Sequence, residues 1–201
     1  MWWSAAYAAM AVGDFTAVEI DTPCSLELVA GDRSSIELVE GSAPTIEVVA
    51  GVLEVRGGED GCVLRGTHVG LTRLAVAGEA AVHVDTLAPR ATVLALGGAR
   101  IAVDMLASDR LDAQLAGTSR LTVHEGSVGS LRLRVTGGSV VDVTGLKAVR
   151  VDVSASTRGE AAVRATHRLD VHAVGGSSVR WVGSPSQRQV RQDRTSAVQG
   201  P

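Results

Sequence analysis

The chain has 201 residues, of which 45% are hydrophobic but only 2% are aromatic, and its formal net charge is −3. This weak acidity argues against a nucleic-acid-binding protein, whose footprint is a basic patch or stripe. The length suits one long domain or two small ones, and the scarcity of aromatic residues is typical of a core that repeats Val, Leu, Ile and Ala in uniform layers.

The first twelve residues, MWWSAAYAAMAV, are apolar and uncharged. They are too few to span a bilayer, and they lack the basic region that opens a signal peptide. Such a run before Gly13 fits the remnant of an export signal, and it fits equally a disordered or packed N-terminus. Membrane contact is expected only through this segment, as a signal or an anchor.

A three-residue phrase, an aliphatic residue followed by a small one and then glycine, recurs down most of the chain. Most of its glycines lie 19 or 20 residues apart, and one 39-residue interval holds a degenerate copy, Val153-Ser154-Ala155. Self-similarity at this period indicates one structural unit stacked many times. The clear copies are Val29-Ala30-Gly31, Val49-Ala50-Gly51, Val76-Ala77-Gly78, Leu96-Gly97-Gly98, Leu115-Ala116-Gly117, Val135-Thr136-Gly137 and Val174-Gly175-Gly176.

Residues 25–51 contain a shorter repeat in which apolar residues alternate with glutamate. Ser25–Gly31, Ser35–Gly41 and Thr45–Gly51 share this pattern, which is typical of a strand with one solvated face. Glycine ends each copy, where the chain must turn. Two such strands in every 20 residues predict one full coil.

One interval, between Gly51 and Gly78, is seven residues longer than a coil. The run Gly57-Gly58-Glu59-Asp60-Gly61 within it predicts an inserted loop near residues 57–63, or a join between two subregions. The only cysteines, Cys24 and Cys62, could pair. Two thiols in so long a chain define no disulfide framework, however, so the sequence favours two separate buried thiols.

From residue 77 each coil offers a first alternating strand and, after a polar turn, a second. Thr86–Arg90, Glu125–Ser130 and Thr144–Ala148 are the predicted turns. No stretch has sustained helical periodicity, so little or no helix is expected. The first strands include 82–84, 101–103, 121–123, 141–143 and 161–163, and the second strands are 91–95, 111–115, 131–135, 149–153 and 169–173.

Two architectures fit this pattern, an antiparallel sandwich and a parallel β-helix. A sandwich requires only local alternation, whereas in a β-helix equivalent residues one coil apart lie directly above each other. Residue types do match at whole-coil spacing, which favours the all-β parallel β-helix with coils of 19–20 residues. The matched series are Val82/Ile101/Leu121/Val141 and Leu111/Leu131/Val151/Val171.

Several short motifs, in order, make the chain similar to the head GIN domain family of putative auto-transporter adhesins. Phe15–Ile20 resembles the family's first strand, Ser25–Gly31 and Ser35–Glu40 its acidic second and third strands, and Gly51–Val55 its "DG-L-x-I" segment. The Gly-rich coil starts resemble its recurrent Gly-Ser-Gly, although that strict triplet is absent here. Ser178–Pro185 is similar to its closing "DV-x-Y-x-G-x-P". The resemblance implies a right-handed β-helix in or outside the cell envelope, and it carries no catalytic residues.

A candidate binding edge is formed by Asp85, Asp104 and His124, which lie 19 and 20 residues apart and would stack as one column. Such a column could bind a divalent cation, or act as the acid–base pair of a β-helical polysaccharide enzyme. Calcium would need more oxygen ligands than it supplies, and a solvated ridge is the simpler interpretation. No catalytic residue, metal site or cofactor is therefore expected.

A second polar column, Asp112/Arg132/Asp152/Asp170, is predicted on the outer face of the second strands, where opposite charges in adjacent layers would pair. Trp181 lies in the last coil, where it could stack on a sugar but more simply covers the end of the apolar stack. The chain is expected to form one β-helical domain over residues 13–198, with a frayed end at 199–201.

The sequence thus predicts a non-enzymatic structural or adhesin-like β-helix of the bacterial envelope or extracellular space. Its outer faces would bind an envelope protein or a glycan, or another copy of the chain, and not nucleic acid. The alternatives are a carbohydrate-active β-helix enzyme working through Asp85, Asp104 and His124, and a module that assembles end to end into filaments.

Overall fold

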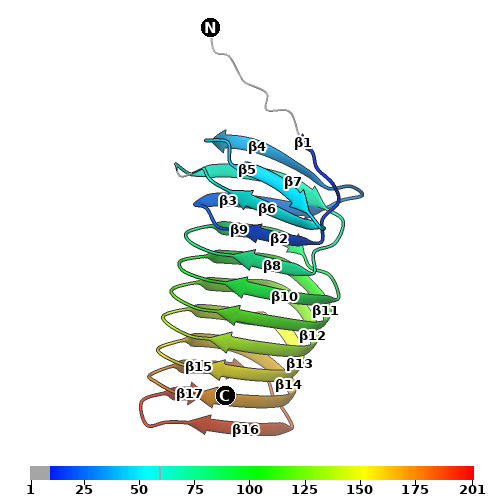
Figure 1. Cartoon of the computed structure of the whole chain (residues 1–201). Coiled ribbons are helices and arrows are strands. Elements are labelled where there is room, and N and C mark those ends of the chain that lie inside the picture. Colours follow the sequence, from blue (N-terminus) through cyan, green and yellow to red (C-terminus); the bar gives the residue numbers. More distant parts are fainter. Residues whose placement is uncertain (1–9, 59) are drawn as a thin grey trace.

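The computed structural model describes residues 10–58 and 60–201, and all its regular elements are β-strands (Figure 1). This part of the chain contains no helix long and apolar enough to cross a membrane. The strands are β1 (Met10–Ala11), β2 (Ala17–Ile20), β3 (Cys24–Ala30), β4 (Ser35–Gly41), β5 (Thr45–Val49), β6 (Val52–Arg56), β7 (Cys62–His68), β8 (Arg73–Val76), β9 (Ala81–Thr86), β10 (Arg90–Ala95), β11 (Arg100–Leu115), β12 (Arg120–Val135), β13 (Val140–Ala155), β14 (Glu160–Ala173), β15 (Ser178–Val182), β16 (Gln187–Gln192) and β17 (Ala197–Gln199).

From β8 onward the chain winds into a parallel β-solenoid with rungs about 20 residues apart, which confirms the predicted fold. Each rung has two faces. The front face, toward the viewer in Figure 1, consists of β2, β6, β8, β10, the second halves of β11–β14, and β16. The back face consists of β3, β7, β9, the first halves of β11–β14, β15 and β17.

The corners between the two faces differ from the prediction. Glu125–Ser130 and Thr144–Ala148 were expected to be polar turns, but β12 and β13 each run through them as one strand of 16 residues. The reason is that each corner carries an inward aliphatic side chain, Val128 or Leu146, which is buried in the core. The corner is therefore part of the hydrophobic stack.

The core is a set of aliphatic columns that run along the solenoid axis. Val82, Ile101, Leu121 and Val141 lie directly above one another and are buried, as predicted. In the other predicted column, Val151 is level with Leu169 and not with Val171. The prediction failed there because β14 is two residues shorter than β13 and shifts its register at the corner.

Glycines form a column at the tight turn of successive rungs. Gly97, Gly117 and Gly137 have φ angles of +73°, +86° and +75°, which L side chains rarely adopt. A Cβ on Gly117 or Gly137 would also lie within 2.6 Å of the carbonyl oxygen of the glycine one rung before. In the next rung Val135 is level with Ala155, so Thr157, with a φ of +52°, takes the glycine position. The degenerate copy is therefore residues 155–157, and not Val153–Ala155.

The N-terminal third departs from the predicted coil over residues 25–51. There β4 pairs antiparallel with β7, and β5 pairs antiparallel with β6. The local cause is the two-residue turn at Ala50 and Gly51, whose φ angles of +51° and +78° suit a tight hairpin. β1 adds a further antiparallel pairing with β4. Residues 1–9 of the apolar N-terminal segment lie outside the described residues.

The order of rungs in space also differs from their order along the chain. The rung formed by β2 and β3 lies between the β6–β7 rung and the β8–β9 rung. Val55 and Val76 are 21 residues apart in the sequence, the length of one coil. In space they lie two rungs apart, because Ile20 lies between them and pairs with both. The 27-residue interval therefore arises because Gly51 belongs to the hairpin, and the chain passes from β7 to β8 across the intervening rung.

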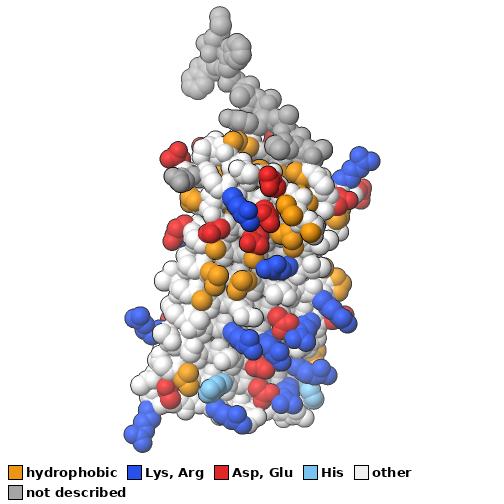
Figure 2. All heavy atoms as spheres, viewed as in Figure 1, with side chains coloured by type: hydrophobic (Ala, Val, Ile, Leu, Met, Phe, Trp, Pro, Cys, Tyr) orange, Lys and Arg blue, Asp and Glu red, His pale blue; other side chains and the backbone are white. Residues whose placement is uncertain are grey.

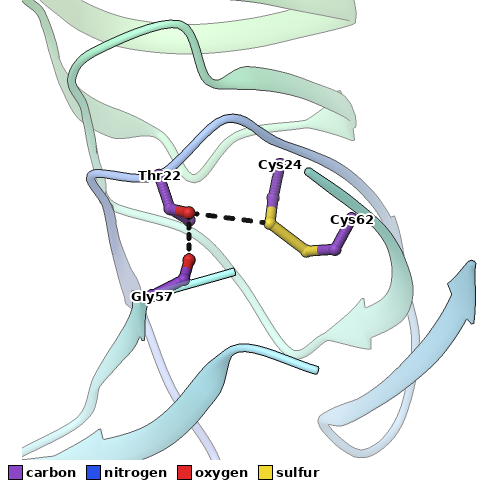
Figure 3. The surroundings of a disulfide bond; sticks show 4 residues. All are labelled: Thr22, Cys24, Gly57 and Cys62. Carbon is purple, nitrogen blue, oxygen red and sulfur yellow. Dashed lines mark hydrogen bonds between the residues drawn. A yellow bond between two sulfur atoms is a disulfide. The ribbon is translucent and has the colours of Figure 1, made fainter. Parts of the chain in front are cut away.

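A disulfide bond joins Cys24 of β3 to Cys62 of β7, which corrects the expectation of two separate thiols (Figure 3). The two residues are direct register partners, with Cα atoms 4.5 Å apart. Beside them the buried Thr22 hydroxyl donates to the Gly57 carbonyl and contacts Cys24 Sγ. The bond fixes the displaced β6–β7 rung to the rung that precedes it in sequence.

At the other end, Trp181 of β15 continues an inward column below Val163 and is 7% exposed. The Arg188 guanidinium lies 5.4 Å from the centroid of its ring, and Gly200 packs so close to the ring that a Cβ would not fit. Asp193 closes the last turn, and hydrogen bonds from Gly175, Ser196 and Thr195 lower its pKa far below the ordinary value. These contacts cover the C-terminal end of the core.

The glycine column makes a prediction with a matched control. Gly137→Ala is expected to cost about 3 kcal/mol, because the new methyl group is strained and also collides with the rung before it. Gly51→Ala has a similar φ angle but open space around it, so about 1 kcal/mol is expected. Urea unfolding of both variants would measure this, and equal losses would contradict the stacking argument.

The disulfide makes a second prediction. Cys24 and Cys62 are 38 residues apart, so replacing both by Ser should lower the free energy of unfolding by about 3–4 kcal/mol through the larger entropy of the unfolded chain. Thermal unfolding with and without reductant gives the measurement. Reductant should lower the melting temperature of the wild type and leave that of the double variant unchanged, and a shift in both would contradict this role.

Candidate functional site

The front face of the solenoid carries a dense group of charged side chains over its C-terminal half (Figure 2). Along these strands inward aliphatic residues alternate with outward polar ones, so every second residue of each rung reaches solvent. Seven arginines and three aspartates project from β10–β14 and β16, and we call them the arginine patch. Its members are Arg90, Arg110, Arg132, Arg134, Arg150, Arg168, Arg191, Asp112, Asp152 and Asp170.

The register stacks these residues in columns, in which neighbouring strands are about 4.8 Å apart. The predicted column Asp112/Arg132/Asp152/Asp170 is present in that order. Fewer of its charges form ion pairs between adjacent rungs than the sequence predicted. In the described structure the column has one such ion pair, between Arg132 Nε and Asp152 Oδ2, which are 3.8 Å apart. Asp112 and Asp170 are instead bound by arginines of their own strands.

Those two pairs are Arg110–Asp112 at 2.6 Å and Arg168–Asp170 at 2.7 Å. The hydrogen bond and the charge of Asp112 raise the pKa of Arg110. Within residues 10–58 and 60–201, no ion pair forms at Arg90, Arg134, Arg150 or Arg191. The patch therefore holds four more positive than negative charges.

Three shallow hollows follow one another along the patch, with volumes of about 290, 210 and 230 Å³. The first two share Arg132, and the second and third share Asp152 and Asp170. From β10 to β16 the patch spans five rung steps, or about 24 Å. The shape is a long, open track along the axis and not a closed pocket.

The chemistry of this track suits an extended anionic ligand. Guanidinium groups form paired hydrogen bonds with carboxylate, sulfate or phosphate groups. The aspartates and the nearby Gln114 and Gln189 can accept hydrogen bonds from hydroxyl groups. A repeating acidic and hydroxylated chain would use both kinds of residue.

The edge predicted from the sequence has a different arrangement. Asp85, Asp104 and His124 do lie in one column across β9, β11 and β12, because the residues before and after each of them are register partners. Yet no hydrogen bond or ion pair of the described structure joins them to each other. Each aspartate is instead held by another histidine.

Asp85 is held by three groups. It accepts hydrogen bonds from the backbone N–H groups of Ala30 and Thr86, at 2.8 and 2.7 Å, and it lies 3.2 Å from Nε2 of His68, whose side chain is fully buried. Burial raises the pKa of Asp85, but these hydrogen bonds and the charge of His68 outweigh it, so the net pKa is lowered. Asp85 thus connects β9 to the ends of β3 and β7.

Asp104 lies 2.9 Å from Nε2 of His83, and both side chains are about half exposed. In the described part of the chain, no three His, Cys, Asp or Glu side chains are grouped to hold a metal ion. Asp85 is committed to structural hydrogen bonds and Asp104 lies on an open edge. Trp181, the other candidate, packs against Gly200 and Arg188, so its ring has little free surface for a sugar.

Sequence reasoning missed His68, His83 and most of the arginine patch. The histidines carry no periodic signal, because their partners come from other rungs. The arginines do carry one: Arg90, Arg100, Arg110 and Arg120 follow at ten-residue steps. In a 20-residue rung with two faces, such a step alternates between the front and the back.

Comparisons with known proteins agree with this fold. The model of a family described as "Putative auto-transporter adhesin, head GIN domain" matches residues 14–185. A putative adhesin from Bacteroides fragilis has a similar structure, with a TM-score of 0.81 and 16% identity over 96% of this chain and 95% of that chain. No curated protein matches the chain significantly in sequence.

Two further solved structures are similar. A putative adhesin from Parabacteroides merdae has a TM-score of 0.72 and 15% identity, over 98% of this chain and 95% of its own. A structure named as a putative lipid binding protein, from Parabacteroides distasonis, has a TM-score of 0.63 and 16% identity, over 96% of this chain and 92% of its own. At these identities the likeness shows the fold alone.

The hydrogen bonds of Asp85 predict that the stability of the folded chain depends on pH. Because its pKa is lowered on folding, the stability it gives is present above its ordinary pKa of 3.8 and is lost as the pH falls through the lowered value. Asp85→Asn should therefore cost about 2 kcal/mol at pH 7 and much less near pH 2. Urea unfolding across this range tests it, and an equal cost at both pH values would count against the prediction.

Proposed function

The chain belongs to the head GIN domain family of putative auto-transporter adhesins, and from this premise we propose that it is a non-enzymatic, adhesin-like protein of the bacterial surface or envelope that binds an acidic glycan along its arginine patch. The observation that carries the proposal is the excess of arginine over aspartate on one continuous open face. Four of the seven arginines are without a carboxylate partner in the described structure.

An envelope or extracellular location is supported by the disulfide as well as by the family. Disulfides form and persist in oxidising compartments such as the periplasm and the cell surface, and they are rare in the cytosol. Cys24 and Cys62 are joined and buried, so they serve to hold two rungs together.

An acidic glycan fits the patch better than a nucleic acid does. Asp112, Asp152 and Asp170 interrupt the arginines, and the backbone of a DNA duplex offers them only phosphates, which they repel, and no free hydroxyl group. A polysaccharide that alternates carboxylate and hydroxyl groups uses the arginines for the first and the aspartates for the second. The shallowness of the hollows suits a chain that lies along the surface.

The predicted edge of Asp85, Asp104 and His124 also fits a binding role better than a catalytic role. General acid–base catalysis needs a carboxyl group free to exchange its proton with the substrate. Asp85 accepts two backbone hydrogen bonds and contacts the buried His68, and these contacts hold its charge in place. The carbohydrate-active alternative would therefore depend on Asp104 and His124, and Asp104 is hydrogen-bonded to His83 instead.

Binding of polygalacturonate, measured by interferometry with the protein immobilised, tests the proposal. Arg134→Ser with Arg150→Ser removes two arginines that form no ion pair, and affinity should fall by about tenfold, roughly 0.7 kcal/mol for each exposed charge. Raising the salt concentration should weaken wild-type binding as well, because exposed charges are screened.

The matched control removes the same charge from the back face. Arg164→Ser with Arg180→Ser should leave the affinity within about twofold of the wild type, because neither residue belongs to the patch. Neutral dextran should not bind. An equal loss in both double variants, or binding of duplex DNA in preference to polygalacturonate, would contradict the proposal.

A further inference from the structure

A second depression lies on the back face, away from the arginine patch. Its volume is about 410 Å³, larger than any hollow of the patch, and it crosses β7, β3, β9, β11 and β12. The volume is within the range of small-molecule sites, about 300–1,000 Å³. Its residues belong to the N-terminal half of the solenoid.

Small outward side chains among longer ones create this depression. Ser25 and Ala81 lie one above the other in one outward column, and Ala102 lies in the next column, level with His83. The short side chains form a diagonal floor. Arg100 and Arg120 stand at one side of it, and Glu27 and His83 stand at the other.

The two arginines are the charges of the depression that have no partner. Arg100 and Arg120 are direct register partners on adjacent rungs, where like charges destabilise a sheet. Within the described residues neither forms an ion pair. On the opposite side, Glu27 is bound by Arg65 at 2.9 Å and His83 by Asp104 at 2.9 Å.

Nearby carboxylates do not compensate these arginines. In the same column, Val140 follows Arg120 and Glu160 is two rungs beyond it. Asp142, in the neighbouring column, accepts hydrogen bonds from the backbone N–H and the hydroxyl of Thr144. A bound anion would therefore relieve the repulsion between Arg100 and Arg120.

We propose that this depression binds one acidic sugar unit, with its oxyanion between Arg100 and Arg120 and its ring over Ser25, Ala81 and Ala102. Two guanidinium groups one rung apart can hold a carboxylate or a phosphate from two sides. Ser25 on the floor, and Thr122, Glu27 and His83 around it, supply hydrogen-bonding groups for sugar hydroxyls. The shared chemistry is an oxyanion on a hydroxylated ring, which a sugar acid or a sugar phosphate could supply.

This site does not depend on the arginine patch, since the two share no residue and lie on opposite faces. A chain that holds an acidic unit at the back and an acidic glycan at the front could bridge two glycan chains. Each face can be inactivated alone, so the two proposals can fail separately.

NMR titration of the isotope-labelled chain tests the proposal with four probes: glucuronate, glucose 6-phosphate, glucose and inorganic phosphate. At least one of the two acidic sugars should bind about tenfold more tightly than both glucose and inorganic phosphate, with shift changes in β3, β9, β11 and β12. The tighter of the two identifies the oxyanion. Glucose binding as tightly as the acidic sugars, or inorganic phosphate doing so, would overturn the site.

Two variants test the arginine charges and the floor of the depression separately. Arg100→Ser with Arg120→Ser should weaken the acidic sugar by about tenfold or more, while Arg134→Ser with Arg150→Ser should leave it unchanged. Ala102→Phe fills the floor and keeps both arginines, so it should abolish binding of the acidic sugar and retain weak binding of inorganic phosphate. Because Ala102 points outward on a strand, the folded state should tolerate this change. Undiminished sugar binding in Ala102→Phe would refute the proposed floor.

Discussion

The structure depends on one constraint, the parallel, in-register pairing of each rung with the next at a spacing of about 4.8 Å. Under this constraint any residue type placed once per coil becomes a column. Val82, Ile101, Leu121 and Val141 form such a column in the core, and Gly97, Gly117 and Gly137 form another at the turn.

The same constraint leaves the two ends of the stack as its weak points. An open rung exposes unpaired backbone groups and bare core, which invite aggregation. At the N-terminal end, antiparallel strands β4 and β5 close the sheet, and the Cys24–Cys62 disulfide and the bonds of Asp85 attach this region to the regular rungs. At the C-terminal end, Trp181 of β15 and Arg188 of β16 cover the core, and the last strand, β17, pairs with β15.

In-register stacking also acts on the outer faces, but there it brings like charges together. Because stacking also aligns outward residues, arginines that recur once per coil gather into columns of like charge. Aspartates offset part of this charge on the front face, through Asp112, Asp152 and Asp170. On the back face Arg100 and Arg120 have no such partners in the described structure. Uncompensated charge on an open, rigid surface favours binding of anionic ligands, and its repetition along the axis favours ligands that repeat as well.

The sequence by itself determined the all-β solenoid, its period, its family and most inward columns, because alternation and whole-coil matching record directly which side chains face the core. It also located the column Asp112/Arg132/Asp152/Asp170. Only the tertiary structure decided that β4 and β5 pair antiparallel, since local alternation does not specify the partner of a strand. For the same reason it alone revealed the contacts between Cys24 and Cys62 and between Asp85 and His68. These join residues from rungs whose order in space differs from their order along the chain, so no sequence spacing encodes them.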